Sequence, residues 1–287
     1  MMYTMTFRLK SRDVNRYRRL RTSRFVEIAQ ECSIAHTTAL GFGREKTLDR
    51  GLIWVVGQQH FDFYRLPLYD EEVTMTTWSG RTRHLLFPRF FRLTSAATGE
   101  KLAEGCTLWV LCSAETRSAV FPEKYGIVIE EDPDEAPLPL PNLIRGFGKG
   151  TERDFTVPFS WCDLNGHMNN ARYFDLLENV CPPAENWQLR SADAEYRGEA
   201  LFNQTYRMET LHQPGRRADS ETSVVSEEAG PQSASAQEQN RDCGPGGEKA
   251  CDDVKQQMRS DDVRMLTLKD EQSRILCRVR MAGTEVH

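Results

Sequence analysis

The chain has 287 residues, a formal net charge of −5 and 39% apolar residues. That length is sufficient for one large domain or two ordinary domains with real cores. The acidic balance gives no general attraction to nucleic acid, and no apolar run is long enough to span a membrane, so we expect neither kind of partner.

The N-terminal segment, residues 1–24, is rich in arginine but has no apolar region typical of a secretory signal. Residues 4–9 already alternate like a strand, and a helical pattern follows, so little precedes the fold and we expect a cytoplasmic protein. The eight cysteines form no C-x-x-C pair, which leaves no zinc or redox motif. We therefore expect no metal and no cofactor, with most thiols in the core.

The first half of the chain combines one helix with several strands. A helical period spans residues 25–34, and strand patterns follow at 51–58, 72–78, 86–93 and 105–112, with a hairpin turn at Gly99. This order predicts an α+β unit in which an antiparallel sheet wraps around a central helix. We place this domain at 1–129 and, from its acidic and proline-rich composition, a linker at 130–150.

The second half, residues 151–287, repeats this order. An extended pattern at 154–161 should place Phe155, Val157 and Phe159 on one face, and a helical pattern follows at 173–180, stopped early by Pro182 and Pro183. Strand patterns recur at 204–208, 263–268 and 274–281. The stretch at about 213–262 has almost no large apolar residues, so we expect a disordered insertion.

A dense polar run, residues 163–170, lies between the extended and helical patterns of the second half. If the strand continues, Asp163, Asn165 and His167 all point to one side. The backbone N–H groups of residues 168–170, near the start of the helix, could then stabilise an oxyanion. The alternative is that Asp163 and Asn165 only form a turn, an asparagine caps the helix, and His167 is incidental.

The two halves can be aligned with each other, Asp13 with Asp163 and Tyr64 with Tyr196, although a repeat resting on two short matches can arise by chance. This alignment places His167 opposite Tyr17 and Glu199 opposite Pro67. The polar set then occurs in the second half alone, which predicts a catalytic second half and a pocket-forming first half. A histidine and a glutamate together can activate water, unless Glu199 simply faces solvent.

The run Asp163-x-Asn165-x-His167-x-Asn169-Asn170, followed by Tyr196-Arg197-x-Glu199, resembles the acyl-acyl carrier protein thioesterases of bacteria and plants. Segments 36–41, 52–56 and 107–111 resemble the N-terminal part of the same family. The resemblance implies a tandem (double) hotdog, α+β, with two antiparallel sheets each wrapped around a long central helix. It also implies hydrolysis of fatty acyl thioesters of acyl carrier protein to free fatty acid.

By the same resemblance, Asp163, Asn165, His167 and Glu199 are the catalytic residues. We assign activation of water to Glu199 and His167, orientation to Asn165, and electrostatic support to Asp163. Attack by the Asp163 carboxylate itself stays open. A cysteine nucleophile after the glutamate, considered for plant members, is excluded because Ala200 occupies that position.

Two other functions stay open: a thioesterase acting on acyl-coenzyme A, and a non-catalytic acyl-binding protein. The expected partner, an acyl carrier protein, is acidic and would require a basic surface. The candidates for it are five arginines near the N-terminus: Arg16, Arg18, Arg19, Arg21 and Arg24. The sequence leaves acyl-chain length and oligomeric state open.

Overall fold

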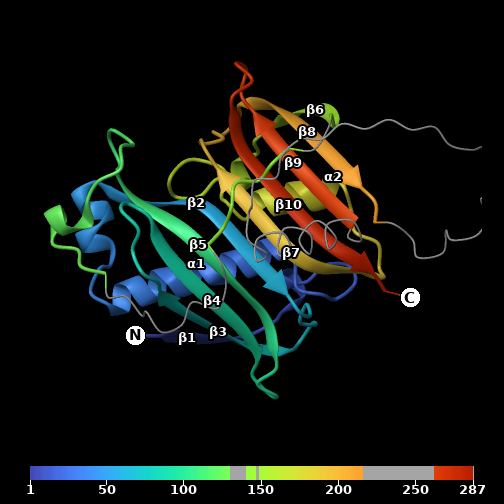
Figure 1. Ribbon diagram of the computed structural model, residues 1–287, viewed down its shortest axis with the longest axis horizontal. Helices are drawn as coiled ribbons and strands as arrows, with labels where there is room; N and C mark the ends of the chain where they lie inside the picture. The colour runs from blue at the N-terminus through green and yellow to red at the C-terminus, as the bar shows by residue number, and fades with distance from the viewer. Residues whose placement is uncertain (130–139, 147–148, 216–261, 287) are drawn as a thin grey trace, which may run out of the picture.

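The computed structural model describes residues 1–129, 140–146, 149–215 and 262–286, and within them it consists of two similar halves (Figure 1). The first half contains β1 (Tyr3–Arg8), α1 (Thr22–Ala39), β2 (Leu52–Phe63), β3 (Glu72–Ser79), β4 (Phe87–Ser95) and β5 (Lys101–Ser113). The second contains β6 (Thr151–Thr156), α2 (Arg172–Val180), β7 (Trp187–Tyr196), β8 (Thr205–Gln213), β9 (Asp262–Lys269) and β10 (Ile275–Glu285). These confirm the predicted α+β composition of both halves and the predicted order of the first, while the second has one further strand, β7.

The two predicted sheets are halves of one antiparallel sheet. Its order, within the described residues, is β1-β3-β4-β5-β2-β7-β10-β9-β8-β6. The halves join where β2 pairs with β7, from Gln58 opposite Glu195 to Asp62 opposite Ser191. The sequence analysis assigned no strand at β7, because its run of alanine, serine and acidic residues has little intrinsic preference for strands.

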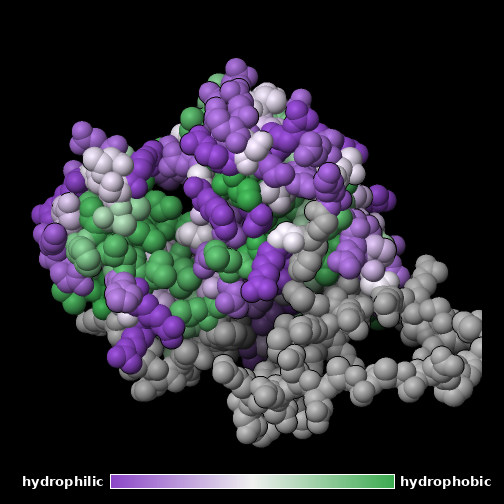
Figure 2. Space-filling model, turned by 45° about the horizontal axis from the view of Figure 1, so that its top comes forward, coloured by the Kyte–Doolittle hydropathy of each residue, from purple (hydrophilic) through white to green (hydrophobic). Residues whose placement is uncertain are grey.

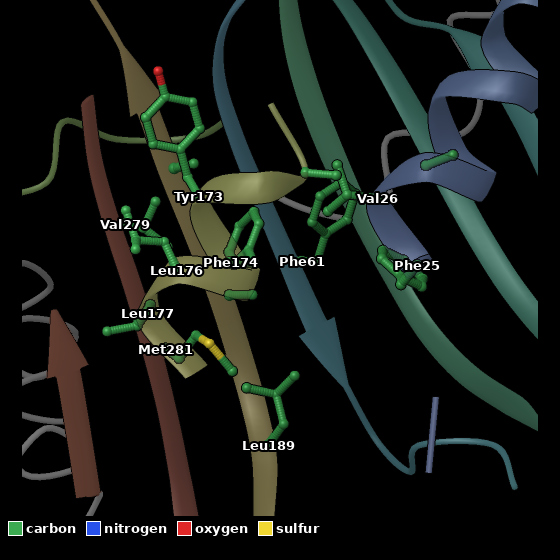
Figure 3. Packing of buried hydrophobic residues seen from close by; sticks show 14 of the residues in the cluster. Phe25, Val26, Phe61, Tyr173, Phe174, Leu176, Leu177, Leu189, Val279 and Met281 are labelled. Atoms are coloured by element: carbon green, nitrogen blue, oxygen red, sulfur yellow. The ribbon is translucent and has the colours of Figure 1, made fainter. Parts of the chain in front are cut away.

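The helices and the inner face of the sheet form one apolar core (Figure 3). Phe25 of α1 packs edge-on against Phe61 of β2, with ring centroids 4.9 Å apart. In α2, the predicted apolar positions Phe174 and Leu177 are fully buried. The core therefore runs from one half into the other and holds both helices against the sheet.

The second helix is much shorter than the first. Helix α1 has 18 residues and α2 has 9, ending at Val180 as the prolines predict. The expectation of a long central helix in each half is thus met by α1 alone. A cavity of about 330 Å³ lies at the C-terminal end of α2, where Cys181, Pro182 and Arg264 contribute to its wall.

Two short hairpins give the register in which the halves correspond. Val14 pairs with Leu20 in the first half as Cys162 pairs with Met168 in the second, with Arg18 (φ 62°) and Gly166 (φ 81°) at the matching left-handed positions. The predicted match of Asp13 with Asp163 is therefore two residues out of register. A short match of polar residues could not reveal this, because the equivalent positions of the two halves are defined by the geometry of the hairpins.

The corrected register changes which residues stand opposite the polar set. In the two halves, Leu20 donates its N–H to Pro67 as Met168 donates its N–H to Ala200. His167 therefore lies opposite Arg19, not Tyr17, and Glu199 opposite Leu66, not Pro67. The first half still offers neither an imidazole nor a carboxylate at these two positions.

Two predicted segments lie largely outside the described residues. Of the expected insertion at 213–262, residues 213–215, at and just after the end of β8, and Asp262, the first residue of β9, are described. Of the expected linker at 130–150, residues 140–146 and 149–150 are described. Ile144 is buried, donates its N–H to Glu195 at 3.2 Å and accepts a hydrogen bond from Arg278 at 2.8 Å, which fixes this stretch to the second half.

Apolar side chains also reach the surface of the first half (Figure 2). The exposed large apolar residues there include Leu48, Val55, Leu86, Phe121 and Val128. In the same half, Leu52, Leu111 and Ile127 form a small buried cluster. Apolar atoms contribute much of any protein surface, so this feature alone assigns no partner.

Candidate active site

The polar run does not continue the strand. Strand β6 ends at Thr156, a short 3₁₀ turn covers Phe159–Trp161, and the chain then reverses between Cys162 and Met168. The prediction that Asp163, Asn165 and His167 share one face of an extended strand is therefore wrong. Phe159 also leaves the apolar face and is 78% exposed.

The reversal is a tight turn closed by backbone hydrogen bonds. Asp163 donates its N–H to the carbonyl of His167 at 3.0 Å, and Gly166 donates to the carbonyl of Asp163 at 3.0 Å. Gly166 has φ 81°, where a side chain would be strained. The turn places Asp163 and His167 directly across from each other, with Asn165 exposed at the tip.

Two side chains of the polar run accept hydrogen bonds from nearby backbone N–H groups. Asp163 Oδ1 accepts the N–H of Asn165 at 2.8 Å, and Asn169 Oδ1 accepts the N–H of Ala171 at 2.9 Å, just before α2. The turn-forming interpretation thus describes Asp163 in this structure, whereas the predicted asparagine cap is wrong, because Ala171 is the N-cap of α2. The interpretation does not describe His167.

His167 and Glu199 come together because their backbones pair. His167 forms a bridge with Leu201, and the N–H of Met168 donates to the carbonyl of Ala200 at 2.8 Å. The Nε2 of His167 lies 3.9 Å from Oε1 of Glu199. This exceeds a direct hydrogen bond but allows one water molecule to contact both atoms.

The imidazole is oriented by its other nitrogen. Nδ1 of His167 lies 3.3 Å from the carbonyl oxygen of Met168, and it can bond to this oxygen only as a donor. In the neutral ring, Nε2 is then the acceptor and faces the side of Glu199. The side chains of His167 and Glu199 are 18% and 38% exposed, so a reactant can reach both.

The expected oxyanion donors are mostly engaged in the fold. The N–H of Met168 bonds Ala200, and that of Asn169 donates to the carbonyl of Trp161 at 2.9 Å. The N–H of Asn170 has no hydrogen-bond acceptor among the described residues. Of the three predicted donors, Asn170 alone is therefore unbonded within the described residues.

A hydrogen-bond chain that begins at Gln59 of the first half supports the loop that carries Asn170. The hydroxyl of Tyr196 donates to the carbonyl of Asn170 at 2.9 Å and accepts a hydrogen bond from Nε2 of Gln59, on β2, at 3.0 Å. Burial raises the pKa of Tyr196 well above its usual value, so the phenol stays a neutral donor. The chain Gln59–Tyr196–Asn170 connects the loop to both halves of the sheet.

Sequence reasoning missed one charged neighbour. Arg117, in the turn after β5, places Nη1 3.2 Å from Oε1 of Glu199. The two residues are far apart in the sequence and belong to different halves, so no local pattern links them.

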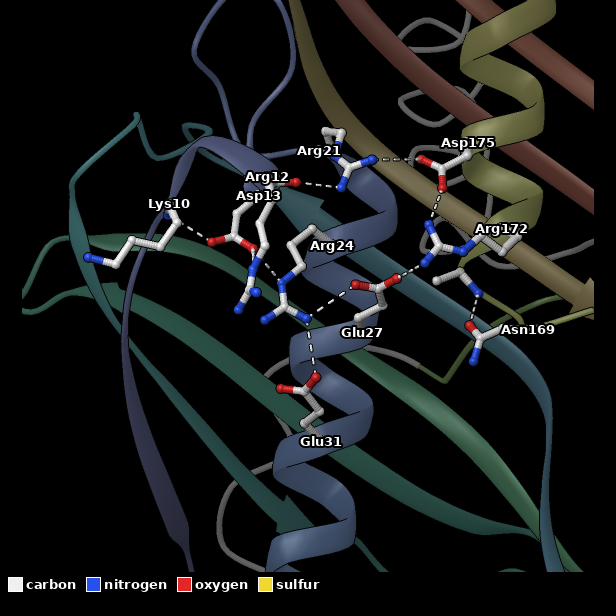
Figure 4. Close-up of polar contacts among 11 residues, drawn as sticks. Lys10, Arg12, Asp13, Arg21, Arg24, Glu27, Glu31, Asn169, Arg172 and Asp175 are labelled. Atoms are coloured by element: carbon white, nitrogen blue, oxygen red, sulfur yellow. Dashed lines mark hydrogen bonds and ion pairs between the residues drawn. The ribbon is translucent and has the colours of Figure 1, made fainter. Parts of the chain in front are cut away.

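Most of the predicted basic surface is engaged in contacts within the fold, and Figure 4 shows those of Arg21 and Arg24. Arg24 pairs with Asp13 at 2.8 Å, Arg21 with Asp175 of α2 at 3.7 Å, and Arg19 donates to the carbonyl of Glu185 at 2.7 Å. Arg24 ties α1 to the N-terminal loop, and Arg19 and Arg21 reach across to the second half. Of the five candidate arginines, Arg16 and Arg18 are left exposed.

Neither a metal site nor a membrane-spanning helix occurs in the described part of the chain. No group of three or more histidine, cysteine or acidic side chains there is arranged to hold a metal ion. None of the described helices combines the length and apolar character needed to cross a membrane.

Comparison with known sequences places this arrangement in a family. Residues 1–124 match the family model described as the acyl-ACP thioesterase N-terminal domain, and residues 146–239 match its C-terminal domain. The acyl-[acyl-carrier-protein] hydrolase FATB2 of Cuphea viscosissima is 26% identical over 215 residues, covering 69% of this chain and 52% of its own length. The chain thus spans about half the length of the curated relatives it matches.

Solved structures share the whole fold. An acyl-ACP thioesterase from Bacteroides thetaiotaomicron superposes with a TM-score of 0.72 at 18% identity, covering 98% of this chain and 97% of its own. The 12:0-ACP thioesterase of Umbellularia californica gives 0.72 at 20% identity, with 99% and 94% covered. These likenesses confirm the predicted double hotdog fold.

Proposed function

This chain belongs to the acyl-ACP thioesterase family, and on that premise we propose that it hydrolyses fatty acyl thioesters of acyl carrier protein, releasing free fatty acid. The observation that carries the proposal is the pairing of His167 with Glu199, at 3.9 Å, in an accessible loop of the second half. Its relatives' names, acyl-carrier-protein hydrolases, support the same reaction.

In the proposed reaction, a water molecule between His167 and Glu199 attacks the thioester carbonyl. The base, formed by Glu199 and His167, takes one proton from the water as the water oxygen bonds to the carbonyl carbon. The resulting tetrahedral intermediate then expels the thiolate. The thiolate then receives that proton, so the products are a fatty acid and the free thiol. General base catalysis of this kind contributes roughly 10²- to 10⁴-fold to the rate.

Asn170 and Asn165 suit supporting roles. The unengaged N–H of Asn170 can donate to the developing oxyanion. The side chain of Asn165, at the exposed tip of the turn, is free to orient the thioester. Asp163 stabilises the turn through the bond from the N–H of Asn165 to its Oδ1, and attack by its second carboxylate oxygen stays an alternative to attack by water.

The test is fatty-acid release from matched acyl carrier protein and coenzyme A thioesters of several chain lengths. We expect Glu199→Gln and His167→Ala to lose about 10²-fold or more in kcat/KM, because each substitution removes one of the two groups that activate the water. Glu271→Gln, an exposed change in the β9–β10 turn, is the matched control.

Activity on coenzyme A esters alone would support the alternative substrate, an acyl-coenzyme A. A folded wild-type protein that binds acyl chains but hydrolyses neither ester would support the non-catalytic alternative. The proposal also includes the cytoplasmic location expected from the sequence, which cell fractionation tests.

A further inference from the structure

We propose that Arg117, from the first half, is a positioning residue of the active site: it holds the Glu199 carboxylate beside His167. The inference rests on the proposed function and extends it, because it gives the first half a part in the chemistry beyond forming a pocket.

The backbone at Arg117 is the first observation. Arg117 closes the turn after β5, donating its N–H to the carbonyl of Ser113 at 2.9 Å. Its φ of 55° is a left-handed conformation, which glycine adopts without penalty and arginine does not. The turn itself therefore gives no reason for an arginine at this position, and a reason must be sought in its side chain.

The side chain provides that reason. Nη1 of Arg117 lies 3.2 Å from Oε1 of Glu199, and this is the same oxygen that lies 3.9 Å from Nε2 of His167. Within the described residues, no hydrogen bond engages Glu199, so the ion pair with Arg117 is the contact that orients its carboxylate. Without Arg117, the side chain could rotate away from the imidazole.

Stability does not explain the pair. The side chains of Arg117 and Glu199 are 47% and 38% exposed, and ion pairs this open contribute little to folding. The pair also joins two halves that the sheet and the core already hold together. Because the contact adds little stability, we attribute it to the orientation that Arg117 gives to the Glu199 carboxylate.

The orientation suits the reaction. The cation holds Oε1 beside Nε2 of His167, where one water molecule can contact both atoms, and Oε2 has no hydrogen-bond partner among the described residues. The guanidinium thus fixes the direction of the carboxylate without blocking it. Lysine would keep the charge but not the planar fork.

The experiment compares Arg117→Gly with wild type on acyl carrier protein thioesters. Glycine suits φ 55°, so the turn is retained while the side chain is removed. We expect kcat to fall about 10- to 100-fold, the order expected when a catalytic group loses its alignment, with KM within about 2-fold of wild type. Arg117→Lys should recover part of this loss.

Two further variants separate positioning from other effects. His84→Gly makes the same backbone change in another turn of the first half, where His84 has φ 54° and is exposed, and it should retain wild-type kcat. In a Glu199→Gln background, Arg117→Gly should cause no further loss, because the residue it positions has lost its function.

The results distinguish the two proposals. An active wild type with an equally active, folded Arg117→Gly variant would overturn the positioning role and leave the proposed function intact. A rise in KM at constant kcat, or a full further loss in the Glu199→Gln background, would also overturn it. A folded wild type that hydrolyses no thioester would overturn the proposed function itself.

Discussion

His60 should make the stability of this protein depend on pH in the alkaline range. It lies on β2 at the junction of the two halves, with Nδ1 2.7 Å from Oδ1 of Asp193 on β7. Asp193 in turn pairs with Arg280 at 2.8 Å and is 8% exposed. Burial alone would lower the pKa of His60, but the hydrogen bonds and charges of Asp193 and Asp62 outweigh it and raise the pKa to about 10.

The direction of this pH dependence follows from the number of protons bound to the folded and the unfolded protein. Between the unfolded pKa of 6.5 and the folded pKa of about 10, the folded protein keeps a proton on His60 that the unfolded chain has lost. The contribution of His60 to stability is complete below pH 6.5 and is lost as pH rises through about 10. The free energy of unfolding should fall by about 1.4 kcal/mol per pH unit in this range, or about 2.7 kcal/mol from pH 7.5 to 9.5.

The measurement is urea unfolding at pH 7.5, 8.5 and 9.5, at constant ionic strength, for wild type and His60→Gln. Buried thiols contribute a dependence of the same sign, since burial raises the pKa of Cys32 to about 11, so the difference between the two proteins is the informative quantity. If the free energy of unfolding fell equally with pH in the two proteins, Asp193 and Asp62 would not hold the proton on His60, and the reasoning would be refuted.

Two further predictions concern packing and turn geometry. Phe174→Ala empties a fully buried position of α2 and should lower the free energy of unfolding by about 3–5 kcal/mol, measured by urea denaturation; a change below about 1 kcal/mol would contradict the observed burial. At the equivalent left-handed positions of the two hairpins, Gly166→Ala should cost about 1–2 kcal/mol, whereas Arg18→Gly should be neutral or stabilising. Thermal unfolding of both variants checks this, and equal effects would argue against the matched register.

Much of the fold could be predicted because its elements have local signals. The apolar period of α1, the apolar run of β2 and the strand patterns of β3 to β5 depend on neighbouring residues alone, and the prolines after Val180 stop α2 where expected. Strand β7 was missed because alanine, serine and acidic residues carry no strand signal, and its pairing with β2 decides that it is one.

The site was predictable as a set of residues but not as a geometry. The motif identified His167 and Glu199, which the structure places 3.9 Å apart, whereas Asn165 lies at the tip of a turn rather than on a shared strand face. The turn depends on Gly166 adopting φ 81°, which an alternating pattern cannot reveal. Arg117 was missed because its proximity to Glu199 exists only after both halves have folded.

The continuous sheet has a consequence for how the site assembles. Since β2 and β7 belong to one polypeptide, the two halves meet at an effective concentration set by the connecting chain, and dilution does not separate them. A homodimer of identical units would carry every substitution twice, once in each copy. A fused pair can keep His167 in one half and Arg19 in the equivalent place of the other, so each half is free to specialise.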